Sequence, residues 1–178
     1  MNPITIFIDK LNQENLWDKN MVLQRKEFLK VNGSIDTNLY FIENGSLRIY
    51  VLDDYEENII RFGYKNNFIA ALDSFISEKP SDLYIQAIKK TKLKVMKKST
   101  FMNFVESSVE NTKIWQAMMG DLIFQQLERE KDILTSSPIE RYKRVLARSP
   151  QLFQEIPNKY IASYLRMAPE TLSRIKKS

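Results

Sequence analysis

Residues 43–51 read ENGSLRIYV, and this stretch decides the fold. The apolar Leu47, Ile49 and Val51 alternate with other residue types, as a half-buried strand requires, and residues 43–45 have the composition of a tight turn. Leu93 and Val95 alternate with lysines in the same way. Short runs of this kind, separated by turn residues from about residue 21 to residue 98, predict a β-sandwich or barrel.

The sequence on both sides of this β-region has helical periodicity. Residues 2 to about 17 place apolar side chains at helix spacing, and a short helix capped by Ser99 is predicted over residues 99–104. Residues 107–110 match a capping box. They open a helix without proline that is predicted to run to about Leu134 and to contain roughly 25 residues.

The predicted long helix carries an apolar stripe that is too wide for one small domain to cover. The stripe consists of Ile114, Trp115, Met118, Met119, Leu122, Ile123 and Leu127. The protein's own β-domain can cover part of it, and a partner helix across a two-fold axis can cover the rest. We therefore expect a parallel homodimer whose seam includes Ile114, Met118 and Leu122.

A new unit begins at Ser137, where a second capping box has proline at the first helical position. Residues 156–177 have the shape of a helix-turn-helix, with Leu172 and Ile175 facing inward in the second helix. Polar residues at offsets of 0, 3, 4 and 7 share the outward face of that helix. These residues are Glu170, Ser173, Arg174 and Lys177, with Thr171 beside them.

Positive charge is concentrated in the same region. Residues 138–178 contain nine Lys/Arg and three acidic residues, a net charge of +6, whereas the whole chain has +5. A basic segment on a nearly neutral body is typical of a module that binds a polyanion. A solvated basic surface would explain the charge alone, but the helix-turn-helix spacing and the long helix upstream favour DNA.

Composition excludes most catalytic and metal chemistry. The sequence has no cysteine and no histidine, and no phosphate loop or nucleophile elbow surrounds its four glycines. We expect no enzyme activity, no metal and no cofactor. Asp9 and Lys10 interrupt the N-terminal apolar stretch before it could form a signal-peptide core, so a cytoplasmic protein without a membrane span is expected.

The order of these elements resembles the Crp/Fnr superfamily of bacterial regulators over nearly the whole chain. The run from Lys26 to Ile49, with a strand over 40–42 before Gly45, looks like the family's cyclic-nucleotide-binding β-roll, and PETLSR at 169–174 looks like its recognition-helix motif. The resemblance implies an α+β fold with an N-terminal double-stranded β-helix of jelly-roll type, a dimerisation helix and a C-terminal helix-turn-helix. The corresponding units are residues 1–106, 107–135 and 136–178.

The resemblance assigns base reading in the major groove to Glu170 and Arg174. Thr171, Ser173, Lys177 and Lys159 suit phosphate contacts by residue type. Two substitutions depart from the family pattern, because Pro169 replaces the first arginine of the motif and Arg166 stands where the turn usually has glycine. No room is left for the family's β-hairpin wing, so we expect a wingless unit or a truncated chain.

The stretch that binds cyclic AMP in some members of the family is degenerate here. Its glycine and glutamate correspond to Ala70 and Ala71, and its arginine corresponds to Ser81, which precedes Asp82. An anion would lose a charged hydrogen-bonding partner and face a carboxylate, so cyclic nucleotide binding is not expected.

The identity of the effector stays open. The family's iron–sulfur and haem sensors are excluded by composition, which leaves a neutral or apolar small molecule, or no effector. The aromatic residues that could line such a site are Phe62, Tyr64, Phe75 and Tyr84, although aromatic residues at these positions can equally fill the core of the roll.

Two functions follow from the sequence. The first is a homodimeric transcription regulator that binds double-stranded DNA, with RNA polymerase as a further candidate partner. The alternative is a β-roll small-molecule sensor whose C-terminal helices bind a protein partner. The two differ in whether the protein shows sequence preference on DNA.

Overall fold

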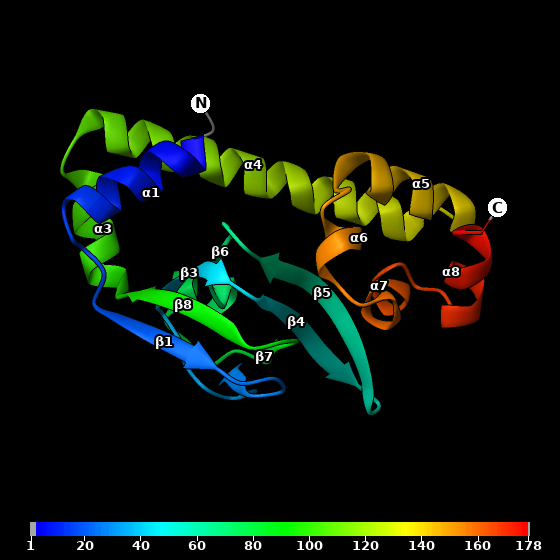
Figure 1. Cartoon of the computed structure of the whole chain (residues 1–178). Helices are drawn as coiled ribbons and strands as arrows, with labels where there is room; N and C mark the ends of the chain where they lie inside the picture. The colour runs from blue at the N-terminus through cyan, green and yellow to red at the C-terminus, as the bar shows by residue number, and fades with distance from the viewer. Residues whose placement is uncertain (1–2, 178) are drawn as a thin grey trace.

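The computed structural model describes residues 3–177 and shows a β-roll, one long helix and a group of short C-terminal helices (Figure 1). Within this range the strands of the roll are β1 (Lys19–Leu23), β2 (Phe28–Lys30), β3 (Leu39–Asn44), β4 (Ser46–Asp53), β5 (Glu56–Tyr64), β6 (Phe68–Ile69), β7 (Tyr84–Ala87) and β8 (Thr91–Met96). They form two antiparallel sheets in the orders β1-β8-β3-β6 and β2-β7-β4-β5. The predicted mixed α+β class with a β-roll is confirmed.

The core of the roll lies between the two sheets. Ile42 of β3 pairs with Leu93 of β8 in one sheet, and Ile49 of β4 pairs with Ile85 of β7 in the other. All four side chains are buried in one hydrophobic cluster. The period-two alternation therefore identified Leu47, Ile49, Leu93 and Val95 as core residues correctly. Val51, which the same alternation placed inward, is half-buried and lies outside this cluster, beyond a register shift between Ile49 and Tyr50.

The outward face of β4 differs from the expectation of a half-buried strand. Arg48 and Tyr50 alternate with the core residues, yet they are only 6% and 3% exposed. Tyr50 belongs to a second hydrophobic cluster that contains residues of the C-terminal helices. Both faces of this strand are covered because a distant part of the chain packs on the outer one.

Gly45 joins β3 to β4 and permits a close approach of two chain segments. Its φ of +105° is costly for any side chain, and a Cβ there would lie 2.5 Å from the Cα of Thr91 and 2.7 Å from the carbonyl oxygen of Lys90. The hydroxyl of Thr91 instead accepts a hydrogen bond from the backbone N–H of Ser46. Glycine is required at position 45 because backbone atoms of Lys90 and Thr91 occupy the space that a Cβ would fill.

Helices α1 (Pro3–Gln13), α2 (Leu72–Ser77) and α3 (Lys98–Glu106) contribute to a third cluster beside the roll, in which Phe7 lies against Phe101 and Phe104. Helix α1 ends earlier than predicted, because Asn15 adopts a φ of +51°. The expected start at Asn2 lies outside the described residues. Helix α3 begins one residue before Ser99, and Lys97 occupies the N-cap position, so Ser99 is not its cap.

The long helix α4 (Val109–Leu134) has 26 residues, close to the predicted length. Its cap is Ser108, whose side chain accepts a hydrogen bond from the backbone N–H of Asn111, so the predicted pair of Ser107 and Glu110 does not form the capping box. Glu110 instead pairs with Lys10 of α1 at 2.7 Å. No helix within residues 3–177 has the length and apolar character needed to cross a membrane.

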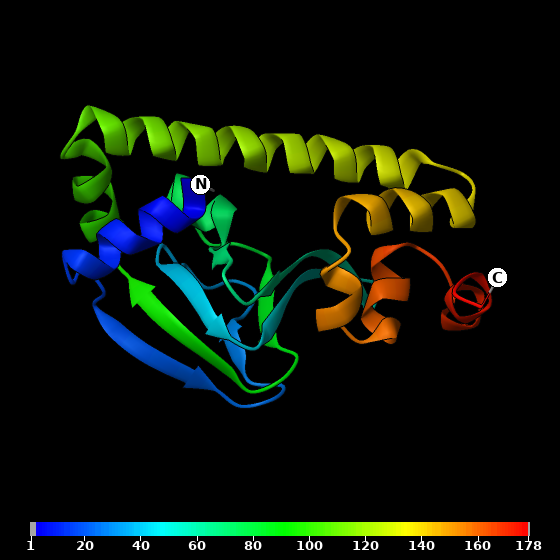
Figure 2. The same cartoon turned by 45° about the horizontal axis from the view of Figure 1, so that its top comes forward.

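Figure 2 shows α4 running along one side of the molecule, with α1 and α3 near its N-terminal half and α5 (Pro138–Arg148) near its C-terminal end. After α5 come α6 (Leu152–Glu155), α7 (Asn158–Tyr164) and α8 (Pro169–Ile175). Ser137 caps α5 and Pro138 lies in its first turn, as predicted. These helices share one hydrophobic cluster with Tyr50, Ile59 and Phe62 of the roll.

Candidate functional site

Helix α8 presents a polar face to solvent at the end of the molecule farthest from β1 (Figure 1). Leu172 is 1% exposed and packs into the cluster shared with the roll. Glu170, Ser173, Arg174 and Lys177 are exposed, and Thr171 is half-buried. The structure therefore places Glu170, Ser173 and Arg174 on a free surface of α8, where their side chains are available to a ligand. Lys177, predicted on the same helical face, is exposed two residues after the helix ends.

The turn between α7 and α8 is held by its backbone. Arg166 has a φ of +53°, and the N–H groups of Arg166 and Met167 donate to the carbonyls of Ser163 and Ala162 at 3.0 and 3.1 Å. These bonds form a Schellman motif, in which glycine usually occupies the left-handed position. Arg166, which stands where the family pattern usually has glycine, adopts this strained conformation.

Arg141 of α5 supports this turn from behind. Its guanidinium donates 3.0 Å to the carbonyl of Arg166 and 2.8 Å to the carbonyl of Thr135, in the segment between α4 and α5. One side chain thus connects the C-terminal end of α4 to the α7–α8 turn. The orientation of α8 relative to α4 depends on this connection.

A cluster of charged side chains joins α4 to α5. Asp132 is completely buried and accepts hydrogen bonds from Arg144 at 3.0 Å and from Arg148. Glu128 lies 3.1 Å from Arg144 and 3.7 Å from Arg148. Two of the nine cations counted in the basic segment are therefore neutralised within the fold, and the free positive charge is smaller than the sequence indicates.

Helix α7 attaches the C-terminal helices to the roll through two tyrosines. The ring of Tyr160 lies 4.8 Å from the guanidinium of Arg48, and the ring of Tyr164 lies 5.4 Å from that of Phe62. Arg129 of α4 stacks on Tyr164 at 3.6 Å. The roll, α4 and α7 therefore meet at these aromatic rings.

Arg48 has a dense set of partners in this contact region. It forms a two-pronged ion pair with Glu57 and donates to the side-chain oxygen of Gln86 at 2.6 Å. Hydrogen bonding to Glu57 and the charge of Glu57 raise the pKa of Arg48 against the effect of burial, which alone would lower it. Its charge is satisfied within the fold.

The degenerate effector stretch is closed by internal hydrogen bonds. Ala70, Ala71 and Ser81 are buried, whereas Asp82 is exposed. The ammonium group of Lys30, 3% exposed, donates to the carbonyls of Val31, Ser81 and Leu83 at 2.8–3.0 Å. Burial lowers the pKa of Lys30, although nearby aspartates oppose this effect. The ammonium group of Lys30 beside this stretch is therefore already hydrogen-bonded within the fold.

The four aromatic residues considered for an effector cavity belong to two hydrophobic clusters outside the core of the roll. Phe62, Tyr64 and Tyr84 belong to the cluster with the C-terminal helices, outside the core of the roll. Phe75 packs with Phe101 and Phe104 in the cluster beside α1. The rings therefore pack in hydrophobic clusters, but not in the core of the roll as the second interpretation expected, and three of them lie in the contact with the C-terminal helices.

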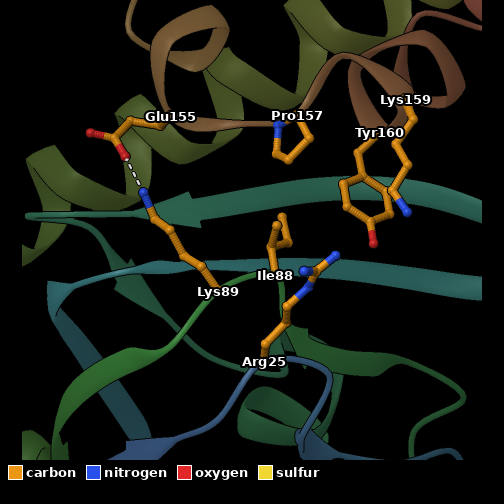
Figure 3. Close-up of a pocket in the computed structure, with 7 residues that line it drawn as sticks. All are labelled: Arg25, Ile88, Lys89, Glu155, Pro157, Lys159 and Tyr160. Carbon is orange, nitrogen blue, oxygen red and sulfur yellow. Dashed lines mark hydrogen bonds and ion pairs between the residues drawn. The ribbon is translucent and has the colours of Figure 1, made fainter.

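A cavity of about 300 Å³ lies between the roll and the C-terminal helices. Its lining residues are Arg25, Ile88, Lys89, Glu155, Pro157, Lys159 and Tyr160 (Figure 3). Lys159, expected to contact DNA phosphate, lies here on α7 and not on the α8 face. The structure thus separates it from the other predicted DNA contacts.

The predicted dimer seam is partly covered by the chain itself. Ile114 and Met118 are half-buried against the cluster of α1 and α3, and Leu122 is also half-buried. Ile123, Phe124 and Leu127 remain 62%, 60% and 51% exposed. The apolar surface left free on α4 therefore centres on residues 123–127, beyond Ile114 and Met118.

Sequence reasoning missed Lys30, Arg48, Arg129 and Asp132. Arg144 and Arg148 lie one turn apart on α5, as do Glu128 and Asp132 on α4, and this matched spacing is a signal for an interhelical ion-pair cluster. No local sequence pattern predicts the burial of Lys30 or Arg129. Among the described residues, no group of acidic side chains is positioned to hold a metal ion.

Comparison with known proteins agrees with the geometry of the roll. Residues 21–108 match the family described as "Cyclic nucleotide-binding domain". No curated protein matches the sequence. Solved structures with the same fold have 14–18% sequence identity to this chain, which shows the fold and not a specific activity.

Three of these structures show the extent of the likeness. FixK2 from Bradyrhizobium japonicum is 18% identical, with a TM-score of 0.73 over 89% of this chain and 82% of that one. A CooA mutant from Carboxydothermus hydrogenoformans is 14% identical, with a TM-score of 0.73 over 96% and 82%. The Thermus thermophilus catabolite activator protein is 14% identical, with a TM-score of 0.61 over 98% and 85%.

Proposed function

We propose that the protein is a sequence-specific DNA-binding transcription regulator of the Crp/Fnr type, in which α7 and α8 act as a helix-turn-helix. The observation that carries the proposal is the outward face of α8, where Glu170, Ser173 and Arg174 are exposed while Leu172 is buried behind them. Similarity of the roll to cyclic-nucleotide-binding domains supports a regulator with a sensor domain.

The residues of α8 have chemistries that suit a major groove. The Arg174 guanidinium can bind two acceptors of guanine at once, and the Glu170 carboxylate can accept from the amino group of cytosine. Thr171, Ser173 and Lys177 are assigned to phosphates. Lys159 is a weaker candidate, because its ammonium group lies over the ring of Tyr160 at 4.6 Å and lines the cavity near the roll.

A homodimer would place two copies of α8 on a two-fold site. Half-sites separated by one helical turn require recognition helices about 34–36 Å apart. The exposed Ile123, Phe124 and Leu127 offer an apolar strip on α4 that a second copy would cover. The seam proposed from Ile114, Met118 and Leu122 therefore extends along α4 to these residues.

The regulator is not expected to respond to cyclic AMP. The lysine nearest the degenerate stretch donates to three backbone carbonyls, and Ser81 offers no guanidinium for a phosphate. Isothermal titration with cyclic AMP should therefore show no saturable heat. A saturable signal would mean that the interior of the roll opens to the nucleotide.

The decisive experiment is selection of binding sites from random duplex DNA by the wild type, Arg174→Ala and Lys65→Ala. Lys65 is exposed on the roll and serves as the control for removal of one charge. We expect a palindromic site for the wild type and Lys65→Ala. For Arg174→Ala we expect a loss of about 1–3 kcal/mol at one base pair, with relaxed preference there.

Salt dependence separates base reading from general charge attraction. Lys177→Ala should weaken binding to all sequences alike and reduce the slope of log affinity against log salt by about 0.9. If no site is enriched, and the wild type and Arg174→Ala bind equally weakly, base reading by Arg174 is wrong. That result would favour the alternative, in which the C-terminal helices bind a protein.

A further inference from the structure

The cavity between the roll and α7 is lined from two units of the chain. Arg25, Ile88 and Lys89 come from the loops that flank β2 and β7, whereas Glu155, Pro157, Lys159 and Tyr160 come from α6, α7 and the link between them. In Figure 3 the side chain of Arg25 extends from the roll toward Tyr160, and Lys89 reaches across to Glu155. A molecule in this cavity would contact both units.

Positive charge dominates the lining. Three cations and one carboxylate leave a net charge of +2, and the carboxylate of Glu155 is already paired with Lys89 at 2.8 Å. Arg25 has no hydrogen bond or ion pair within residues 3–177. A free guanidinium presents parallel donors that match a carboxylate or phosphate group.

The rest of the lining is apolar. Ile88 is only 7% exposed, and Pro157 lies opposite it in Figure 3. The ring centroid of Tyr160 lies 4.8 Å from the Arg48 guanidinium and 4.6 Å from the Lys159 ammonium. A bound molecule could therefore place an apolar or planar body against Ile88 and Tyr160 while its anionic group meets Arg25.

We propose that this cavity binds a small organic anion, with a carboxylate or phosphate head and a compact apolar body. Its volume of about 300 Å³ is at the lower end of the range of about 300–1,000 Å³ for small-molecule sites, which favours a compact ligand. The site is separate from the interior of the roll, where Lys30 is already satisfied. Binding would hold α7 against the roll and stabilise the docked arrangement.

The proposal does not depend on DNA binding, and its test uses the full chain. Phenyl phosphate, which combines a dianionic head with one aromatic ring, is titrated while backbone amide shifts are followed by NMR. We expect saturable chemical-shift changes at the amides of Arg25, Lys89 and Lys159. Sodium chloride at equal ionic strength should not produce these saturable changes. The melting temperature of the wild type should rise with phenyl phosphate.

Arg25→Gln is the matched variant, with Lys65→Gln as the control that removes an exposed charge elsewhere on the roll. Arg25→Gln should raise the Kd for phenyl phosphate at least tenfold and abolish the thermal shift, whereas Lys65→Gln should change neither. Because the Arg25 side chain is exposed and unpaired, the variant should have the melting temperature of the wild type without ligand. Inorganic phosphate should bind more weakly, since it has no apolar body.

Four results would overturn the proposal. The first is equal Kd values for wild type and Arg25→Gln, and the second is shifts that do not saturate. The third is a response of these amides to duplex DNA but not to phenyl phosphate, which would assign the cations to nucleic acid. The fourth is equal Kd values for inorganic phosphate and phenyl phosphate, which would show that the site does not recognise an apolar body.

Discussion

The guanidinium of Arg129 lies 3.6 Å from the ring centroid of Tyr164, and this contact joins the long helix α4 to α7, the helix that packs on the roll. Arg129 is only 6% exposed, and two of its nitrogen atoms, Nε and Nη1, have no hydrogen-bond partner within the described chain. Burial lowers the pKa of this side chain. The contact therefore contains a buried charge that the fold compensates mainly by stacking.

Replacing Arg129 with methionine should stabilise the protein. Each unsatisfied buried donor costs about 1–3 kcal/mol, whereas a desolvated cation–π contact contributes about 2 kcal/mol, so the penalty of two donors exceeds the gain. We expect Arg129→Met to raise the free energy of unfolding by about 1 kcal/mol in urea denaturation. Arg129→Ala, which also loses packing, should be less stable than Arg129→Met, and a methionine variant below wild type would contradict this account.

Removal of the Asp132 carboxylate should destabilise the α4–α5 junction. Loss of one partner from a fully buried ion pair costs about 3–5 kcal/mol. Arg144 and Arg148 have side chains that are 36% and 23% exposed, so water can partly solvate the charges left behind. We expect Asp132→Ala to lose about 2 kcal/mol of unfolding free energy in urea.

The control for this prediction is Asp121→Ala, on the exposed side of α4, where the carboxylate has no ion pair within residues 3–177. It should change the free energy of unfolding by less than about 0.5 kcal/mol. Equal losses for the two variants would show that the cluster of Asp132, Arg144 and Arg148 does not stabilise the junction.

Arg166→Gly should stabilise the α7–α8 turn. A non-glycine residue in the left-handed region costs about 1–2 kcal/mol, while glycine loses about 0.5–1 kcal/mol more backbone entropy on folding. The carbonyl that accepts from Arg141 is retained. We expect a gain of about 0.5 kcal/mol in thermal unfolding. Arg166→Ala keeps a Cβ, so its stability should match that of the wild type. If Arg166→Ala gained as much stability as Arg166→Gly, backbone strain would not be the cause.

Alkaline pH should reduce stability through Tyr40. Burial raises the pKa of Tyr40, and the adjacent Asp36 carboxylate, which accepts from its hydroxyl at 2.8 Å, raises it further. The unfolded chain loses this proton near pH 10, while the folded protein retains it. The unfolded state then binds fewer protons, so the stability present below about pH 10 declines above it.

The measurement is the melting temperature from pH 8.5 to 11 for the wild type, Tyr40→Phe and Tyr55→Phe. Tyr40→Phe should be less stable at pH 8.5 and should have a shallower decline above pH 10. Tyr55 is fully exposed, so Tyr55→Phe should follow the wild type. Parallel curves for all three proteins would exclude Tyr40 as a source of the decline.

A charge on the free apolar strip of α4 should prevent dimerisation. Leu127 is 51% exposed in one chain, and burying a glutamate there in a dimer would be unfavourable. We expect Leu127→Glu to be a monomer in light scattering at concentrations where the wild type is a dimer. Gln125→Glu adds the same charge at an exposed position about 160° around the helix from Ile123 and Leu127, outside the apolar strip, and should leave the dimer intact. A dimeric Leu127→Glu would exclude this strip as the interface.

Sequence by itself determined the elements whose signals are local. Alternation in β4 and β8 defined the inward face of the roll, because side chains in a strand point to opposite sides at every second residue. Ser137 and Pro138 defined the start of α5, because a cap and a fixed φ act within one helical turn. Glu170, Ser173 and Arg174 were placed together by helical period alone.

Only the tertiary structure decided what covers the outer face of β4 and which charges remain free. The contact between Ser163 and Glu57 joins residues 106 positions apart, and periodicity carries no information on such pairings. Arg144 and Arg148 counted as basic residues in the sequence, yet Glu128 and Asp132 on another helix neutralise them. Arg25 and Lys159 line one cavity because α7 packs on the roll. This packing results from the burial of apolar surfaces that are distant in the sequence, and not from local conformation.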